Sequence, residues 1–106
     1  MKVKARIVLT TAGSQEEAQK IGHALVERKL AACVNIVPGI ESIYRWQGKV
    51  ESAAEWLLVV KTTAEAFSSV RDAIQELHSY DLPECVMLEV GDGSEAYLGW
   101  IGENVE

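Results

Sequence analysis

Residues 33–63 read "CVNIVPGIESIYRWQGKVESAAEWLLVVKTT", and this segment is the most informative about the fold. Its apolar residues are mostly β-branched or aromatic, which favours extended chain over helix. Gly48 lies in a turn signal between two extended runs, so the stretch predicts a long β-hairpin. Pro38 and Gly39 interrupt the first arm, and a proline within a strand is typical of a bulge or an edge position.

A strand and a helix are predicted before the hairpin. Residues 3–12, "VKARIVLTTA", are rich in Val, Ile and Thr and predict the first strand. Ser14 and Glu17 then have the spacing of a capping box, in which each side chain bonds the other residue's backbone amide. Apolar residues at helical spacing follow, so the first helix is predicted over about 15–30.

A second helix and strand are predicted after the hairpin. Thr62 and Glu65 form a second possible capping box, and apolar spacing then predicts a helix over about 64–78. The segment "ECVMLEV", residues 84–90, predicts the last strand. Ser94 can cap a short terminal helix.

The predicted order is β-α-β-β-α-β with a C-terminal helix, within one domain over 1–106. Split βαβ units of this kind form an α+β fold, in which a four-stranded sheet carries both main helices on one face: the ferredoxin-like arrangement. The usual strand order, 4-1-3-2, places Cys33 and Cys85 on opposite edges, too far apart to form a disulfide. We expect both to be small buried residues rather than reactive thiols.

The composition and net charge of the chain argue against some classes of binding partner for this protein, namely nucleic acid and membrane. The chain has 106 residues, 48% of them hydrophobic and 25% charged, as in one globular domain. The net charge of −6 would repel nucleic acid. No apolar run approaches the ~20 residues that cross a bilayer, so we expect no membrane partner. Two cysteines are too few for a disulfide scaffold, which favours a cytoplasmic location.

The hairpin also predicts how the chain assembles. Each arm can reach about ten residues, longer than the sheet of a small domain usually needs. Its apolar side chains and unpaired edge would otherwise be left in water. The hairpin is then either strongly twisted and covered by the last helix, or paired edge to edge with other copies of the chain in a closed ring.

Four segments together resemble the CutA family, the divalent-cation tolerance proteins. They are "LAACVNIVPGIESIYRWQGKVE", "LLVVKTT", "LHSYDLPEC" and "YLGWI", in that order along the chain. The resemblance implies a ferredoxin-like homotrimer with strands paired across subunits, and a role in tolerance to divalent cations such as copper. It also implies an architecture similar to that of the PII signalling proteins, trimers that bind small ligands between subunits.

The resemblance points to three candidate metal-ligand positions, and this sequence keeps a ligand residue at only one of them. In the family, a cysteine at the end of the first strand and two adjacent histidines are proposed to bind copper. Here Thr10 stands at the cysteine position, and Leu77 and His78 at the histidine positions. We therefore expect no obligatory cofactor and weak binding of Cu(II) or another divalent cation, with His78 as the single imidazole donor beside Asp81 and Glu84. Alternatively, a protonated His78 is stabilised at the C-terminus of the second helix.

A second candidate site draws on several segments. Tyr44 and Trp46 alternate to one face of the hairpin, Lys61 ends the third strand, and Glu84 starts the fourth. Such a set can hold a small anionic metabolite between subunits. Alternatively, Lys61 and Glu84 form an ion pair that fixes the trimer. The predicted inter-subunit pocket comprises Tyr44, Trp46, Lys61, Tyr80, Asp81 and Glu84.

We expect a binding protein rather than an enzyme. The sequence contains no G-x-S-x-G, no H-E-x-x-H and no phosphate-binding GxxxxGKS/T. Two functions follow from the patterns above. The first is a metal-responsive or metal-binding trimer, and the second is a signalling or scaffold trimer that binds a small molecule or a partner protein in its inter-subunit clefts.

Overall fold

The computed structural model describes residues 2–106; Met1 lies outside the described residues. The described elements confirm the predicted order and the α+β fold. They are β1 (Ala5–Ala12), α1 (Gln15–Glu27), β2 (Cys33–Trp46), β3 (Lys49–Thr63), α2 (Phe67–Leu77), β4 (Val86–Glu89) and α3 (Glu95–Glu103). Within these residues, no helix is long and apolar enough to cross a membrane.

The strands form one antiparallel sheet in the order β2-β3-β1-β4. This is the predicted order, read from the other edge. Cys33 begins β2 and Cys85 directly precedes β4, so the two thiols lie at opposite edges, as predicted. Both are half-buried rather than buried, because an edge strand has a neighbour on one side only. Burial raises the pKa of the Cys85 thiol, which disfavours its reactive thiolate form.

The first helix begins as predicted and ends early. The Ser14 hydroxyl accepts a hydrogen bond from the amide of Glu17 at 3.1 Å, so the predicted cap is present. The helix ends at Glu27, where the chain turns through Lys29 with a φ of 59°. A basic side chain is rarely found in this left-handed conformation, and the apolar spacing gave no sign of it.

The second helix begins later than predicted, and its predicted capping box was wrong. The helix starts at Phe67, and its first residues have no side-chain cap. The Thr62 hydroxyl instead donates to the carbonyl oxygen of Leu30 at 2.7 Å, which joins β3 to the segment after α1. The contact crosses 32 residues, and for that reason local spacing could not indicate it.

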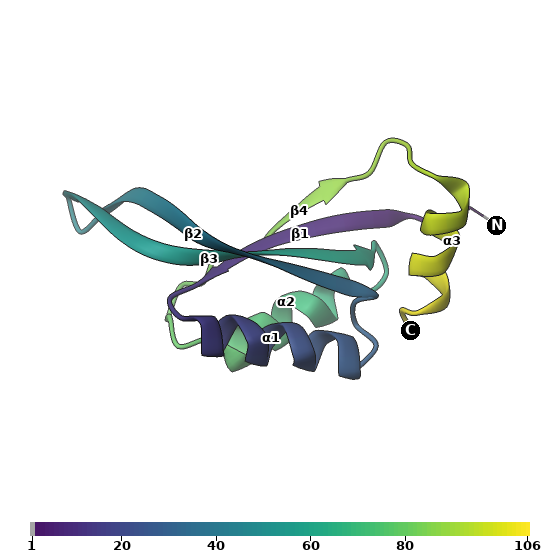
Figure 1. Cartoon of the computed structure of the whole chain (residues 1–106), viewed down its shortest axis with the longest axis horizontal. Coiled ribbons are helices and arrows are strands. Elements are labelled where there is room, and N and C mark those ends of the chain that lie inside the picture. Colours follow the sequence, from purple (N-terminus) through teal and green to yellow (C-terminus); the bar gives the residue numbers. More distant parts are fainter. Residues whose placement is uncertain (1) are drawn as a thin grey trace.

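Both long helices lie on the same side of the sheet (Figure 1). Their apolar faces pack on the even-numbered residues of β1 and β3, and the core is fully buried there. It includes Val8, Ile21, Leu25, Leu58, Val60, Val70 and Ile74. The third helix packs on Ala5 and Ala32 through Ile101, at the end of the sheet opposite the hairpin tip. It therefore does not cover the hairpin.

The β2–β3 hairpin projects beyond the helices and makes the molecule 47 Å long but only 25 and 23 Å across (Figure 1). Its arms have 14 and 15 residues, more than the ten predicted. The predicted interruption is present as a shift in register between Val37 and Ile40, with Gly39 at a φ of 75°. A residue with a side chain would be strained in that conformation. Trp46, near the tip, is 50% exposed.

Candidate functional site

His78 lies directly after α2, with its side chain fully buried. Its Nε2 lies 2.6 Å from the carbonyl oxygen of Thr11 in β1. Its Nδ1 accepts a hydrogen bond from the amide of Tyr80 at 3.1 Å. An accepting Nδ1 carries no proton, so Nε2 carries it and donates to Thr11. Both ring nitrogens are thus engaged within the chain, and the ring lies at the C-terminal end of α2, where the sequence placed it.

Glu17 of α1 lies close to Nδ1 of the His78 ring. Its Oε2 accepts a hydrogen bond from the amide of Ser79 at 3.1 Å, and its Oε1 lies 3.5 Å from Nδ1 of His78. This Oε1 atom is buried and has no hydrogen-bond partner among the described residues. The carboxylate thus joins the start of α1 to the loop that follows α2.

Tyr80 extends this network to β3. Its hydroxyl donates to Oε2 of Glu55 at 2.8 Å, and its ring lies 4.6 Å from the His78 ring. Burial, then the hydrogen bond to Glu55 and its charge, raise the pKa of Tyr80 to about 12. Gly13 leaves room for this hydroxyl, because a Cβ atom there would lie 2.8 Å from it. We call Thr11, Glu17, Glu55, His78 and Tyr80 the His78 cluster.

The hydrogen bonds of the His78 cluster affect whether His78 can bind a metal ion. Both ring nitrogens of His78 are hydrogen-bonded, so a metal ion could bind this ring only after one of these bonds breaks. Asp81 and Glu84 are exposed to solvent on the loop that follows. Within residues 2–106, no three His, Cys, Asp or Glu side chains are grouped to hold a metal ion. We therefore do not assign His78 as a metal ligand.

One chain does not assemble the predicted pocket. Tyr44 pairs with Glu51 and Trp46 with Lys49, near the hairpin tip, whereas Lys61 pairs with Cys33 at the far end of the sheet. At about 3.3 Å per residue, Lys49 and Lys61 of β3 are about 40 Å apart. Among the ion pairs of the described chain there is also no Lys61–Glu84 pair. The six predicted residues can meet only if neighbouring subunits contribute some of them.

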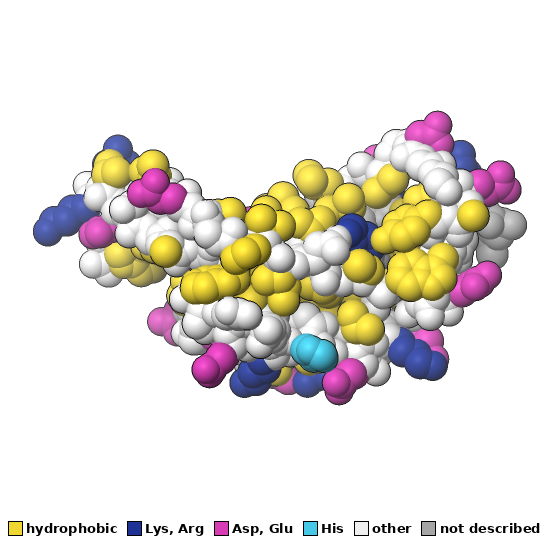
Figure 2. All heavy atoms as spheres, in the orientation of Figure 1, with side chains coloured by type: hydrophobic (Ala, Val, Ile, Leu, Met, Phe, Trp, Pro, Cys, Tyr) yellow, Lys and Arg dark blue, Asp and Glu magenta, His cyan; other side chains and the backbone are white. Residues whose placement is uncertain are grey.

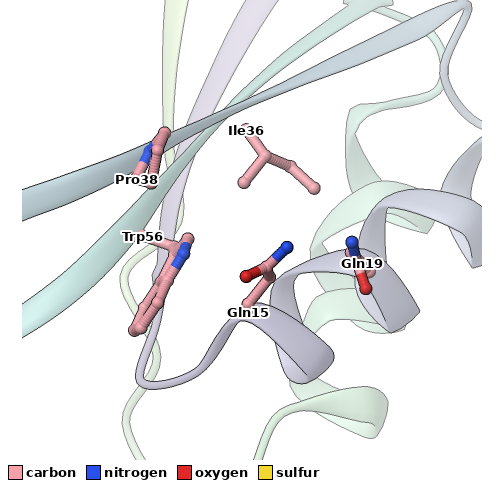
Figure 3. Close-up of a pocket in the computed structure, with 5 residues that line it drawn as sticks. All are labelled: Gln15, Gln19, Ile36, Pro38 and Trp56. Carbon is pink, nitrogen blue, oxygen red and sulfur yellow. The ribbon is translucent and has the colours of Figure 1, made fainter.

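Sequence reasoning missed a groove between α1 and β2 (Figure 3). Two adjoining hollows of about 230 and 340 Å³ share Gln19 and Ile36. The alternation of Val34 and Ile36 on an edge strand was the available signal, since an edge strand leaves part of its apolar side open. The first hollow is lined by Gln15, Gln19, Ile36, Pro38 and Trp56.

The sheet face opposite the helices is apolar. The strand register places odd-numbered residues of β1 and β3 on this face, and neither α1 nor α2 covers it within the described chain. Figure 2, in the view of Figure 1, shows hydrophobic side chains gathered across the middle of the molecule. We call the side of the sheet opposite the helices the outer sheet face. Its apolar residues are Ile7, Leu9, Val37, Leu57, Val59, Val86 and Leu88.

Thr10 of β1 provides a test of the packing on the opposite, helix-covered side of the sheet. Its side chain is fully buried, and its hydroxyl has no hydrogen-bond partner among the described residues. Replacing Thr10 with the isosteric Val should raise the free energy of unfolding by about 1 kcal/mol, because an unpaired buried hydroxyl is removed. Thr62→Val is the matched control; it should lose about 1–3 kcal/mol, because the Leu30 carbonyl loses its donor. Urea unfolding at one protein concentration measures both. A loss in Thr10→Val would show that the hydroxyl has a partner.

The fold and the His78 cluster together define a class: a small α+β protein of ferredoxin-like topology, with one helix-covered and one open apolar sheet face. The chain belongs to the CutA1 divalent ion tolerance protein family, whose sequence model matches residues 6–104. The resemblance stated from sequence is thereby confirmed.

Curated relatives and solved structures agree with this membership. A divalent-cation tolerance protein CutA of Thermus thermophilus is 52% identical over 92% of this chain and 95% of its own length. Its counterpart in Archaeoglobus fulgidus is 46% identical over 93% of this chain and 96% of its own. A solved Thermus thermophilus structure superposes with a TM-score of 0.95 at 50% identity, covering 96% of this chain and 99% of that one.

Proposed function

We propose that this chain acts as a homotrimer in divalent-cation tolerance. The outer sheet face carries the proposal, because an apolar surface of this extent on a soluble domain usually marks an interface. A second support is the pair of sheet edges. β2 is one edge and β4 the other, so a contact between the β2 edge of one chain and the β4 edge of the next joins two different surfaces. Such a head-to-tail contact forms a ring when the rotation closes. Three as the number of subunits rests on the family resemblance.

The trimer also provides the ligand site that one chain lacks. Tyr44 and Trp46 are 44% and 50% exposed, and Lys61 is half-buried about 40 Å away along β3. We propose that the hairpin tip of one subunit meets the Lys61 end or the 80–84 loop of another. Aromatic rings, a lysine and carboxylates would then line a cleft for a small anionic metabolite. This second function, a PII-like signalling or scaffold trimer, is favoured by the exposed aromatic rings at the tip.

Cation binding is proposed to be weak and at the surface. His78 is enclosed by hydrogen bonds, whereas the His23 side chain is 79% exposed, with Nδ1 at 4.0 Å from Oε1 of Glu27. An exposed imidazole beside one carboxylate can hold Cu(II) loosely but cannot complete the donor set of a dedicated site.

A calorimetric Cu(II) titration distinguishes the two histidines. We expect His23→Ala to lose most of the binding heat, and His78→Gln to retain it, because only His23 offers an open nitrogen. Circular dichroism should first show that both variants are folded. Submicromolar affinity that survives in both variants would mean that the ligands lie elsewhere.

Two further predictions concern enzymatic activity and cellular location. The relatives' names describe cation tolerance and give no reaction, and we propose that this chain is likewise not an enzyme. We also propose a cytoplasmic location. The names of relatives include other compartments: an Arabidopsis thaliana protein, of whose length this chain covers 54%, is called chloroplastic, and a solved Archaeoglobus fulgidus structure is called periplasmic.

Native mass spectrometry of protein purified without an affinity tag tests the proposed function. We expect three chains per particle, with a small-molecule mass increment on the trimer only and no retained metal after buffer exchange. Tightly retained divalent ions would contradict weak surface binding. A particle of one chain would contradict both the proposed trimer and the proposed inter-subunit clefts.

A further inference from the structure

We propose that Asp92 is a site of spontaneous isoaspartate formation, and that this modification loosens the attachment of α3. Asp92 lies in the loop of residues 90–94, which arches between β4 and α3 (Figure 1). Of the three aspartates and two asparagines of the chain, it is the only one followed by glycine. The proposal goes beyond the proposed function, since it needs neither the trimer nor a bound cation.

The two groups that would react are neighbours in the structure. The backbone nitrogen of Gly93 donates a hydrogen bond to Oδ1 of Asp92 at 2.8 Å. Because Oδ1 is bonded to Cγ, this nitrogen lies close to the carbon atom that it would attack. Both residues are exposed, so water reaches the reacting groups. Glycine also has no Cβ atom to hinder the approach of its own nitrogen.

The loop leaves its backbone free to adopt the cyclic form. Residues 90–94 belong to no helix or strand. Within residues 2–106, the backbone hydrogen bonds outside the helices and strands involve none of residues 91–93. The space beside Gly91 is open as well, since a Cβ atom there would meet nothing within 4 Å. Ring closure at Asp92 therefore breaks none of the backbone hydrogen bonds that hold β4 and α3 in place.

The reaction needs only water and a proton from solvent, and returns both. The Gly93 nitrogen forms a bond with Cγ of Asp92 and loses its proton. One carboxylate oxygen accepts that proton and a second one from solvent, and leaves as water. Water then adds to either carbonyl carbon of the cyclic succinimide, breaks the bond from that carbon to nitrogen, and a proton returns to solvent. Opening at the main-chain carbonyl gives isoaspartate, and opening at the other carbonyl restores aspartate.

Isoaspartate would act on α3 because the residues that follow it hold the N-terminus of this helix. The main chain becomes one methylene group longer directly before Gly93. Gly93 packs closely on Leu98, since a Cβ atom at Gly93 would lie 3.2 Å from Cδ2 of Leu98. Ser94 caps the helix by accepting from the Tyr97 amide at 3.4 Å. A longer chain displaces Gly93 and Ser94 from these positions, so the first turn of α3 should open more often.

Incubation of the folded wild-type chain for several weeks in neutral buffer tests the site. Trypsin then releases residues 72–106 as one peptide, because no Lys or Arg follows Arg71. Electron-transfer fragmentation distinguishes isoaspartate from aspartate at each position of this peptide. Asp72 in α2 and Asp81 in an exposed loop are internal controls, since larger residues follow them. We expect Asp92 to convert at least about tenfold faster than Asp81. Equal rates at Asp92 and Asp81 would overturn the proposal.

The variant Asp92→Glu makes the test specific. It keeps the charge but moves the carboxyl group one methylene further out, which disfavours ring closure. Aged wild-type protein should accept methyl groups from a protein-isoaspartate methyltransferase at residue 92, and aged Asp92→Glu should accept none there. Hydrogen exchange of the Tyr97 amide should quicken at least about threefold in the aged wild type and stay unchanged in the aged variant. Isomerised protein with unchanged Tyr97 exchange would contradict the effect on α3.

Discussion

Replacing Val59 with Glu should convert the assembled protein to single chains. Val59 lies at the centre of the outer sheet face, paired with Asn35 of β2 and Leu9 of β1. If this face is an interface, the new carboxylate is buried without a partner, which costs several kcal/mol per subunit. The isolated fold should survive, because Val59 points away from the helix-covered core and is half-buried in one chain.

Size-exclusion chromatography with light scattering measures this effect. Ser68→Glu is the matched control, since it adds the same charge on the exposed surface of α2. It should leave the particle mass unchanged. Circular dichroism should show native secondary structure in both variants. An assembled Val59→Glu protein with wild-type mass would mean that the outer sheet face is not the interface.

Replacing His78 with Ala should lower the free energy of unfolding by about 2–4 kcal/mol. The substitution leaves the Thr11 carbonyl and the Tyr80 amide without their partners and opens a cavity at a fully buried position. His23→Ala, at an exposed position, should change stability by no more than about 0.5 kcal/mol. Urea unfolding at a fixed protein concentration measures both. A His78→Ala protein as stable as wild type would show that water replaces the ring without cost.

Local patterns predicted the elements of this fold well. The β-branched run of residues 33–63, with Gly48 between its arms, specified the hairpin, and the Ser14 cap specified the start of α1. Helix ends were less predictable, because a left-handed Lys29 and a late start at Phe67 depend on tertiary contacts. The Thr62 hydroxyl shows the reason: its partner, Leu30, is distant in sequence.

The candidate site was harder to predict than the fold. His78 was singled out by residue type, but its role depends on Thr11, 67 residues away, and on Glu17. No spacing rule connects those positions. The predicted inter-subunit pocket stays a prediction, because alternation along β2 gives the face of Tyr44 and Trp46 but not their distance from Lys61. Because of that distance, the predicted pocket depends on assembly.

Sedimentation equilibrium at micromolar concentration measures whether the chain assembles and how many chains the particle holds. The exposed apolar residues of the outer sheet face, the two free-standing sheet edges and the projecting hairpin all predict assembly. The family resemblance predicts that the particle holds three chains. The unfolding midpoint should then rise with protein concentration, because assembly and folding are linked by mass action. A mass of three times 11.6 kDa is the expected result. A mass of one chain, with an unfolding midpoint independent of concentration, would contradict the trimer and every site that depends on a neighbouring subunit.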